Sequence, residues 1–135
     1  MTKAEREAFL AGVHVGIASI ENPGHGPLAA PIWYAYEPGG AVTMLIGPDS
    51  QKARLLKRAG RMSLCAQTEA APYKYVSVEG PVAITKPPRD ATLKMAIRYL
   101  GETVGRQYAA NGNGDSVWVT LTPERWRTTD YSKRR

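Results

Sequence analysis

Five basic residues follow a potential helix start and are suited to binding an anion. They are Lys52, Arg54, Lys57, Arg58 and Arg61, and no acidic residue lies among them. Asp49 or Ser50 can cap a helix over about residues 51–59. At about 100° per residue, four of the five basic side chains project from one side of this helix, opposite Leu55 and Leu56. Lys52 alone projects with the leucines, toward the predicted core.

The inward position of Lys52 is costly unless an anion lies beside it. A helix N-terminus offers free N–H groups and a partial positive charge, which attract anions. The sequence therefore predicts a phosphate site made of backbone N–H groups, the Ser50 hydroxyl and the Lys52 ammonium. The alternative is that Lys52 extends past the helix start into solvent. The segment is not a P-loop, because it lacks the required glycine spacing.

A proline interrupts an aromatic-rich strand predicted over residues 28–36. Pro31 cannot donate to a sheet ladder, so it marks an edge, a bulge or an opening in the strand pairing. Ile32, Trp33 and Tyr34 follow directly. Exposed backbone groups beside aromatic side chains suit a flat heterocycle. The alternative is that Ile32 and Tyr34 are core residues at period two, with Trp33 on the other face.

The remaining reactive residues do not form a recognisable catalytic or metal-binding pattern. His14 and His25 have no carboxylate or cysteine at ligand spacing, so we expect no metal site. Cys65 lies in an apolar strand, where a buried hydrophobic role is expected. No nucleophile motif occurs, and no catalytic residue is predicted. If the protein is an enzyme, a cofactor must supply its chemistry.

Alternating hydrophobic residues predict a mainly β protein. Strands are expected over residues 13–18, 28–36, 42–47, 62–67, 74–85 and 117–121, with a further edge segment at 125–130. A capping box of Thr2 and Glu5 opens a short helix. Pro87 and Pro88 precede a helix of about twenty residues, whose expected core stripe is Leu93, Ile97, Leu100, Val104 and Tyr108. Short strands joined by turns predict a closed or partly closed antiparallel barrel.

Composition limits the partners and the location. The 135 residues predict one domain over residues 1–135, and the formal charge of +6 favours an anionic partner. A single cysteine fits a reducing compartment, and neither a signal peptide nor an 18-residue apolar run is present, so we expect a cytoplasmic protein without a membrane partner. A nucleic-acid partner is disfavoured, because it calls for exposed aromatics on a sheet rather than an inward lysine.

Three segments resemble a known family. They are PIWYAYEPGG at residues 31–40, GPDSQKARLLKRAGRMSLCAQ at 47–67 and YKYVSVEGPV at 73–82. The chain is similar to split β-barrel flavin and deazaflavin oxidoreductases related to pyridoxamine phosphate oxidase, and more so to the actinobacterial branch that uses coenzyme F-420. The resemblance spans about residues 5–130. It implies a six-stranded antiparallel split β-barrel with flanking helices, assembled as a homodimer with two cofactor sites at the interface.

The resemblance also implies roles for individual residues. Those expected to line the flavin or deazaflavin ring are Pro31, Ile32, Trp33 and Tyr34. Those matching the phosphate-binding helix start are Ser50, Gln51, Lys52 and Ala53, with Arg54 leading a basic face for an anionic tail. A loop near the cofactor, contributed by the other subunit, matches Pro72, Tyr73 and Lys74; taken alone, this loop is either a solvated turn or a lip over a bound ring.

The implied activity is hydride transfer between F-420 and an electron-poor organic acceptor. The first alternative is an FMN-binding oxidoreductase of the same fold, for which the helix start alone would suffice. The second is a carrier that binds F-420 or a flavin without turnover. Oxidation of vitamin B6 compounds is not expected, because the sequence shows no clear equivalent of the additional substrate-binding arginines.

Overall fold

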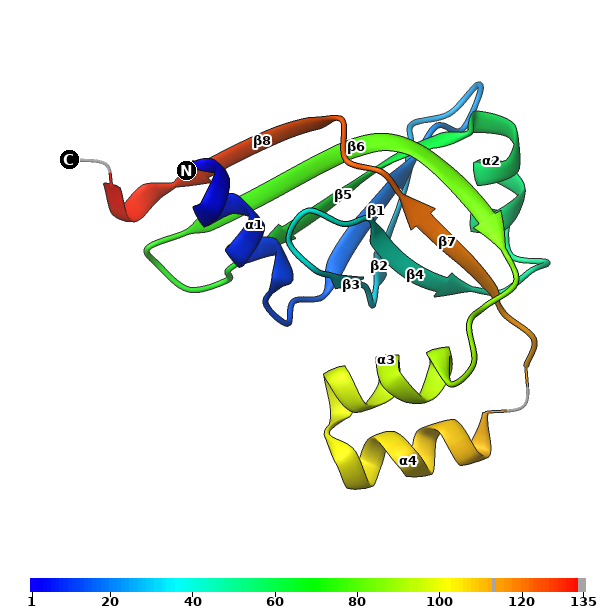
Figure 1. The fold of residues 1–135 in the computed structure, drawn as a ribbon. Coiled ribbons are helices and arrows are strands. Elements are labelled where there is room, and N and C mark those ends of the chain that lie inside the picture. The colour runs from blue at the N-terminus through cyan, green and yellow to red at the C-terminus, as the bar shows by residue number, and fades with distance from the viewer. Residues whose placement is uncertain (113, 134–135) are drawn as a thin grey trace.

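The computed structural model describes residues 1–112 and 114–133 and consists of one curved antiparallel sheet flanked by helices (Figure 1). The strands are β1 (Gly16–Ile20), β2 (Leu28–Ile32), β3 (Ala35–Tyr36), β4 (Val42–Ile46), β5 (Arg61–Gln67), β6 (Lys74–Thr85), β7 (Val117–Leu121) and β8 (Arg125–Asp130). The helices are α1 (Lys3–Ala11), α2 (Gln51–Ala59), α3 (Ala91–Leu100), α4 (Glu102–Asn111) and a final 3-10 turn, η1 (Tyr131–Lys133).

The long strand β6 joins the two halves of the sheet. The order is β2-β1-β5-β6-β7-β4-β3, and β8 also pairs with β6. The first part of β6 pairs with β5 and β8, whereas its end pairs with β7 through the partners Val82↔Leu121 to Thr85↔Trp118. A side chain at Gly80 would overlap the carbonyl oxygen of Thr122, so this position between the two halves requires glycine.

The core lies on the concave face of the sheet. Alternate residues of the central strands are buried, as the period of two predicts, and include Met44, Leu64, Val78 and Leu121. Leu10 of α1 and Ala53 and Leu56 of α2 complete this core. The mainly β, split-barrel class predicted from the sequence is therefore confirmed.

Three details of the prediction were wrong. The described residues form eight strands rather than six, because residues 28–36 form two strands separated by Trp33 and Tyr34 and because the further edge segment expected at 125–130 is present as β8. The single helix of about twenty residues is a hairpin, because Gly101, at φ +84°, ends α3 and reverses the chain. The expected core stripe is interrupted, since its second half, Leu100, Val104 and Tyr108, is exposed.

The α3–α4 hairpin lies below the curved sheet in Figure 1. It is inserted between the paired strands β6 and β7. The two ends of the described chain lie together on the other side, where Lys133 Nζ is 2.7 Å from Glu5 Oε1. Among the described residues, no helix is long and apolar enough to cross a bilayer.

Candidate functional site

The start of α2 is organised by the hydroxyl of Ser50. Its Oγ accepts the Ala53 N–H at 3.1 Å and donates to the carbonyl of Gly47 at 2.7 Å. Ser50 is thus the cap of α2, and its hydroxyl proton is already used within the chain. The N–H groups of Gln51 and Lys52 lie in the first turn, where no intrahelical acceptor exists. These two backbone donors, rather than the Ser50 hydroxyl, remain for an anion.

Lys52 differs from the other basic side chains of α2. It is half-buried, whereas Arg54, Lys57 and Arg58 are exposed, as the helical spacing predicts. Arg54 turns back over the helix start, where its guanidinium donates to the Asp49 carbonyl at 2.8 Å. Within residues 1–112 and 114–133, no acidic side chain forms an ion pair with these four cations. The helix start therefore presents uncompensated positive charge beside two backbone donors.

Arg61 is not part of this basic face. It lies in β5, and its guanidinium is 2.6 Å from the carboxylate of Glu124. The hydrogen bond to Glu124 raises the pKa of Arg61. The prediction that grouped Arg61 with the outer cations was wrong, because the helix ends at Ala59 and helical spacing does not extend past it. The basic face of α2 consists of Arg54, Lys57 and Arg58.

Where β2 and β3 separate, side chains of α3 form hydrogen bonds with the backbone of Tyr34. The hydroxyl of Tyr99 accepts the Tyr34 N–H at 2.9 Å and lies 2.6 Å from the carbonyl oxygen of His14, to which it donates. Arg98 donates through Nε to the Tyr34 carbonyl at 2.9 Å and through Nη2 to the Gly12 carbonyl at 2.9 Å. The sequence predicted an edge, a bulge or an opening in the strand pairing at Pro31. Pro31 itself is paired within the edge strand β2, and the strand breaks just after it, at Trp33 and Tyr34. The backbone of Tyr34 is nevertheless satisfied within the chain.

The four ring-lining candidates separate in space. Ile32 and Tyr34 are buried in the core, as the alternative interpretation of this strand predicts, and the Tyr34 hydroxyl donates to the Leu10 carbonyl at 2.7 Å. Burial raises the pKa of Tyr34 well above its ordinary value. Pro31 is exposed on β2, opposite Ile17 of β1. Trp33 borders a cavity.

Trp33 stands in an aromatic cluster between the sheet and the helical hairpin. Its ring stacks on that of Tyr99, with centroids 4.9 Å apart and planes 6° apart. The ring of Tyr108 lies 5.5 Å from it at a tilt of 49°. A cavity of about 160 Å³ adjoins this cluster; its lining residues are Trp33, Leu45, Ile46, Gly47, Thr92, Met95, Tyr108 and Ser116. Because Gly47 also accepts the hydrogen bond from Ser50, the cavity reaches the cap of α2.

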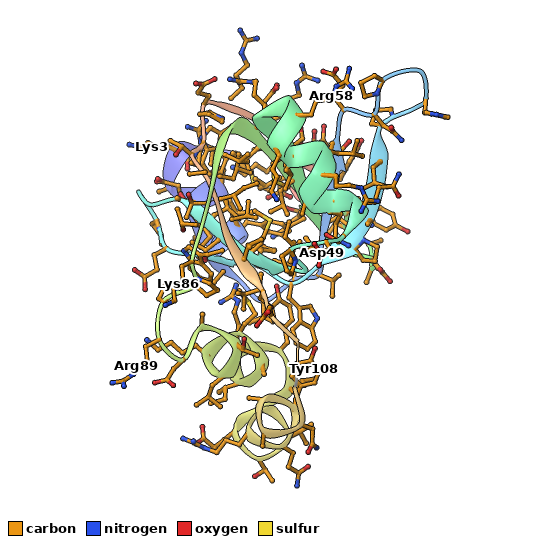
Figure 2. The ribbon with its side chains drawn as sticks, turned by 90° about the vertical axis from the view of Figure 1, so that its right-hand side faces the viewer. Lys3, Asp49, Arg58, Lys86, Arg89 and Tyr108 are labelled. Carbon is orange, nitrogen blue, oxygen red and sulfur yellow. The ribbon has the colours of Figure 1, made fainter. Side chains whose placement is uncertain are left out.

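Figure 2 shows this side of the molecule. Asp49, just before α2, and Tyr108, on α4, both appear on the face turned to the viewer, with the basic helix above the hairpin. Because Gly47 and Tyr108 line the same cavity, the start of α2 and the aromatic cluster are parts of one region. The structure therefore brings Trp33 together with the helix start.

The loop of Pro72, Tyr73 and Lys74 lies elsewhere. The β5–β6 ladder runs from Arg61↔Pro81, next to the end of α2, to Gln67↔Tyr75, next to this loop. Figure 1 accordingly shows α2 and the loop at opposite ends of the sheet. Tyr73 is exposed, and the Lys74 ammonium is 4.0 Å from the Asp130 carboxylate. Within one chain, the loop and the helix start do not form a common site.

Sequence reasoning missed the contributions of the hairpin. Arg98 and Tyr99 bind the backbone of Tyr34, which lies 64 and 65 positions earlier in the chain, and no local pattern predicts such pairs. Tyr108 was assigned to a core stripe. The break at Gly101 was the available signal, because glycine commonly follows the last residue of a helix.

The region offers little acid–base chemistry of its own. Among the described residues, no His, Cys, Asp, Glu, Lys or Arg lines the cavity. His14 stacks on Phe9, and burial lowers its pKa; burial likewise raises the pKa of Cys65. Within the described part of the chain, no three His, Cys, Asp or Glu residues gather as a metal site. The arrangement can bind and orient molecules, and a redox reaction here requires a cofactor.

Comparison with known proteins assigns the family. The family model for pyridoxamine 5′-phosphate oxidase matches residues 2–130, so the chain belongs to this family. The resemblance seen in the sequence is thus confirmed. Comparison with curated protein sequences gave no significant match.

Solved structures share the fold at low sequence identity. A conserved hypothetical protein of Mycobacterium tuberculosis, Rv2991, is 24% identical, with 97% of this chain and 86% of that chain covered and a TM-score of 0.78. A protein described as an F-420 reductase is 23% identical, with 90% and 94% covered and a TM-score of 0.72. An FAD-binding protein of Mesorhizobium loti is 16% identical, with 95% and 92% covered and a TM-score of 0.69.

Proposed function

We propose that this protein is an oxidoreductase that binds coenzyme F-420 and transfers hydride to an electron-poor organic acceptor. The observation that carries the proposal is the cationic start of α2 beside the Trp33 cluster. Gln51 and Lys52 offer backbone donors there, and Lys52, Arg54, Lys57 and Arg58 have no acidic partner among the described residues. The structural likeness to a protein described as an F-420 reductase supports the same choice.

The residues fit the anionic part of the cofactor better than its ring. The N–H groups of Gln51 and Lys52 and the half-buried Lys52 ammonium would hold one phosphate. The exposed cations Lys57 and Arg58 would lie along a longer anionic tail. When bound, the deazaflavin ring supplies the hydride, and Trp33 would border it. The protein would bind and orient the cofactor, because none of the described residues that line the cavity is an acid or a base.

A second copy of the chain would complete the site. The loop of Pro72, Tyr73 and Lys74 is too far from α2 to share a ligand within one chain, but a homodimer can bring the loop of one protomer to the helix start of its partner. The exposed apolar residues Val13, Val15 and Ile17, on and just before β1, offer a surface for this association.

FMN is the second candidate, favoured by one specific observation. Ser50 donates its hydroxyl proton to Gly47, and Arg54 turns back to the Asp49 carbonyl. The donors left at the helix start match a single phosphate, which is what FMN carries. A carrier that binds either cofactor without turnover shares the same contacts and differs only in lacking an acceptor reaction.

Titration of the purified protein with F-420 and FMN, side by side, tests the proposal. We expect F-420 to bind more tightly, and reduced F-420 to be oxidised by a quinone or enone.

Lys52→Ala should weaken binding by about 1–3 kcal/mol, the scale of a lost charge-assisted hydrogen bond. Lys57→Ala should weaken F-420 but not FMN, and Lys3→Ala, on α1, serves as the control for net charge.

Three results would change the assignment. Tighter binding of FMN would reverse the order of the two cofactors. Tight binding without reduction of any acceptor would favour the carrier. Unchanged affinity in Lys52→Ala would remove the phosphate assignment at α2.

A further inference from the structure

A groove between α3 and the sheet has an apolar floor. Met95 of α3, which is buried, lines it together with Ala35 of β3 and Trp118 of β7. Met95 also lines the cavity beside Trp33, so the two hollows are neighbours along α3. We call the hollow lined by Ala35, Met95 and Trp118 the α3 groove. Both methionine and tryptophan make favourable contacts with aromatic rings, so its floor suits a flat aromatic body.

Three cations surround this apolar floor. Arg89, Lys94 and Arg98 line the α3 groove; the first two are exposed and Arg98 is half-buried. Among the described residues, no acidic side chain lines the groove or forms an ion pair with any of the three. Asp90 follows Arg89 in the chain but lines a different hollow, together with Arg106. The α3 groove therefore carries uncompensated positive charge.

Arg98 is held in place by the backbone. Its Nε donates to the Tyr34 carbonyl at 2.9 Å, and its Nη2 donates to the carbonyls of Gly12 at 2.9 Å and Ala11 at 3.2 Å. Within residues 1–112 and 114–133, Nη1 has no acceptor. Carbonyl dipoles satisfy two nitrogens but supply no counter-charge, and a half-buried arginine is ordinarily paired. A ligand that brings a negative charge here meets a cation that is already oriented.

We infer that the α3 groove binds a small aromatic carboxylic acid. The aromatic body lies against Met95 and Trp118, and the carboxylate faces Arg98 and Lys94. An uncharged ring would leave the cations unpaired, whereas inorganic phosphate would leave the apolar floor exposed to water. This site goes beyond the proposed function and does not depend on it.

Binding is tested on the purified chain by 19F NMR, with 6-fluoro-2-naphthoate as the probe and the uncharged 6-fluoro-2-naphthamide as its matched control. The two molecules have the same aromatic body and differ in charge. We expect the naphthoate to bind at least tenfold more tightly than the amide. Octanoate, which has the carboxylate without a ring, should displace the naphthoate only at a much higher concentration.

Substitutions locate the probe in the groove. Arg89→Gln and Lys94→Gln each remove one exposed cation and should weaken the naphthoate about threefold, the scale of an exposed ion pair, without changing the amide. Ala35→Phe places a ring in the groove and should weaken both probes at least tenfold. Lys86→Gln is the control, because Lys86 is exposed just before the hairpin and does not line the groove. Arg98 is left intact, since it also holds the backbone.

Four results would overturn the inference. They are equal binding of naphthoate and amide, equal displacement by octanoate, unchanged naphthoate binding in Ala35→Phe, and a loss in Lys86→Gln as large as in Lys94→Gln. Displacement of the naphthoate by F-420 would assign the groove to the cofactor and overturn a separate site. If F-420 does not bind at all, the proposed function fails, while naphthoate binding is still decided by its own measurement.

Discussion

At the scale of single residues, the hydroxyl of Tyr99 accepts a backbone hydrogen bond that a neighbouring strand would otherwise accept. Its hydroxyl satisfies the N–H of Tyr34 where β2 and β3 separate, and its ring supports Trp33. A buried backbone group without a partner costs about 1–3 kcal/mol. One phenol therefore stabilises the strand break and fixes the aromatic wall of the cavity.

Replacing Tyr99 with phenylalanine separates these two roles. Tyr99→Phe keeps the ring but removes the hydroxyl, so we expect a loss of about 1–3 kcal/mol in the free energy of unfolding, measured by urea denaturation. Tyr108→Phe is the control, since no hydrogen bond of its hydroxyl is seen in the described residues. Equal stability of Tyr99→Phe and the wild type would show that the hydroxyl is not needed at the break.

At the scale of elements, β1 and the segment before it present an apolar surface to solvent. Val13, Val15 and Ile17 are 57%, 52% and 39% exposed. The alternation that predicted a strand here is real, although β1 begins only at Gly16, and its buried residues are Gly16, Ala18 and Ile20. The exposed set is the surface that the proposed homodimer would cover.

A charge on this surface should separate the protomers. We expect Val15→Asp to lower the mass in sedimentation equilibrium from that of a dimer to that of a monomer, and to weaken cofactor binding at least tenfold if both protomers contribute to each site. Val104→Asp, at a residue equally exposed on α4, is the control. A monomeric wild type that binds cofactor fully would contradict the dimer proposal.

The sequence predicted the elements better than their contacts. Alternation identified the strands, the capping residues identified α1 and α2, and Pro31 marked the edge strand β2. The identity of the groups that close the break was not predictable, because Arg98 and Tyr99 reach Tyr34 only through the fold. Helical spacing alone also could not distinguish one long helix from the α3–α4 hairpin.

At the scale of the whole molecule, an ion pair joins the two ends of the described chain. The hydrogen bond from Lys133, together with the bonds to Thr2, lowers the pKa of Glu5 from 4.5 to about 2. Because the folded pKa lies below the ordinary value, the ionised carboxylate favours the folded state at pH above 4.5. This contribution is lost as the pH falls toward 2.

Removing the lysine should therefore shift the titration of Glu5. In Lys133→Met we expect the pKa of Glu5 to rise toward 4.5, while the bonds to Thr2 retain part of the lowering. Carboxyl NMR titration measures this directly, and Lys3→Met, on the same helix as Glu5, is the control. Both residues of the pair are exposed, so the effect on overall stability should be small. A Glu5 carboxylate that titrates near 4.5 in the wild type would contradict the pairing.

The place of the α3–α4 hairpin in the chain has a consequence for how such proteins diversify. Thr85 and Trp118, the partner residues between which it is inserted, are already held by the ladder of β6 and β7. Changes in the length or sequence of α4 therefore need not alter the sheet, whereas α3 is constrained by Tyr99 at the strand break. The α4 side of the cavity, which carries Tyr108, can therefore differ between proteins of this fold without a change in the sheet or in the support of Trp33 by Tyr99.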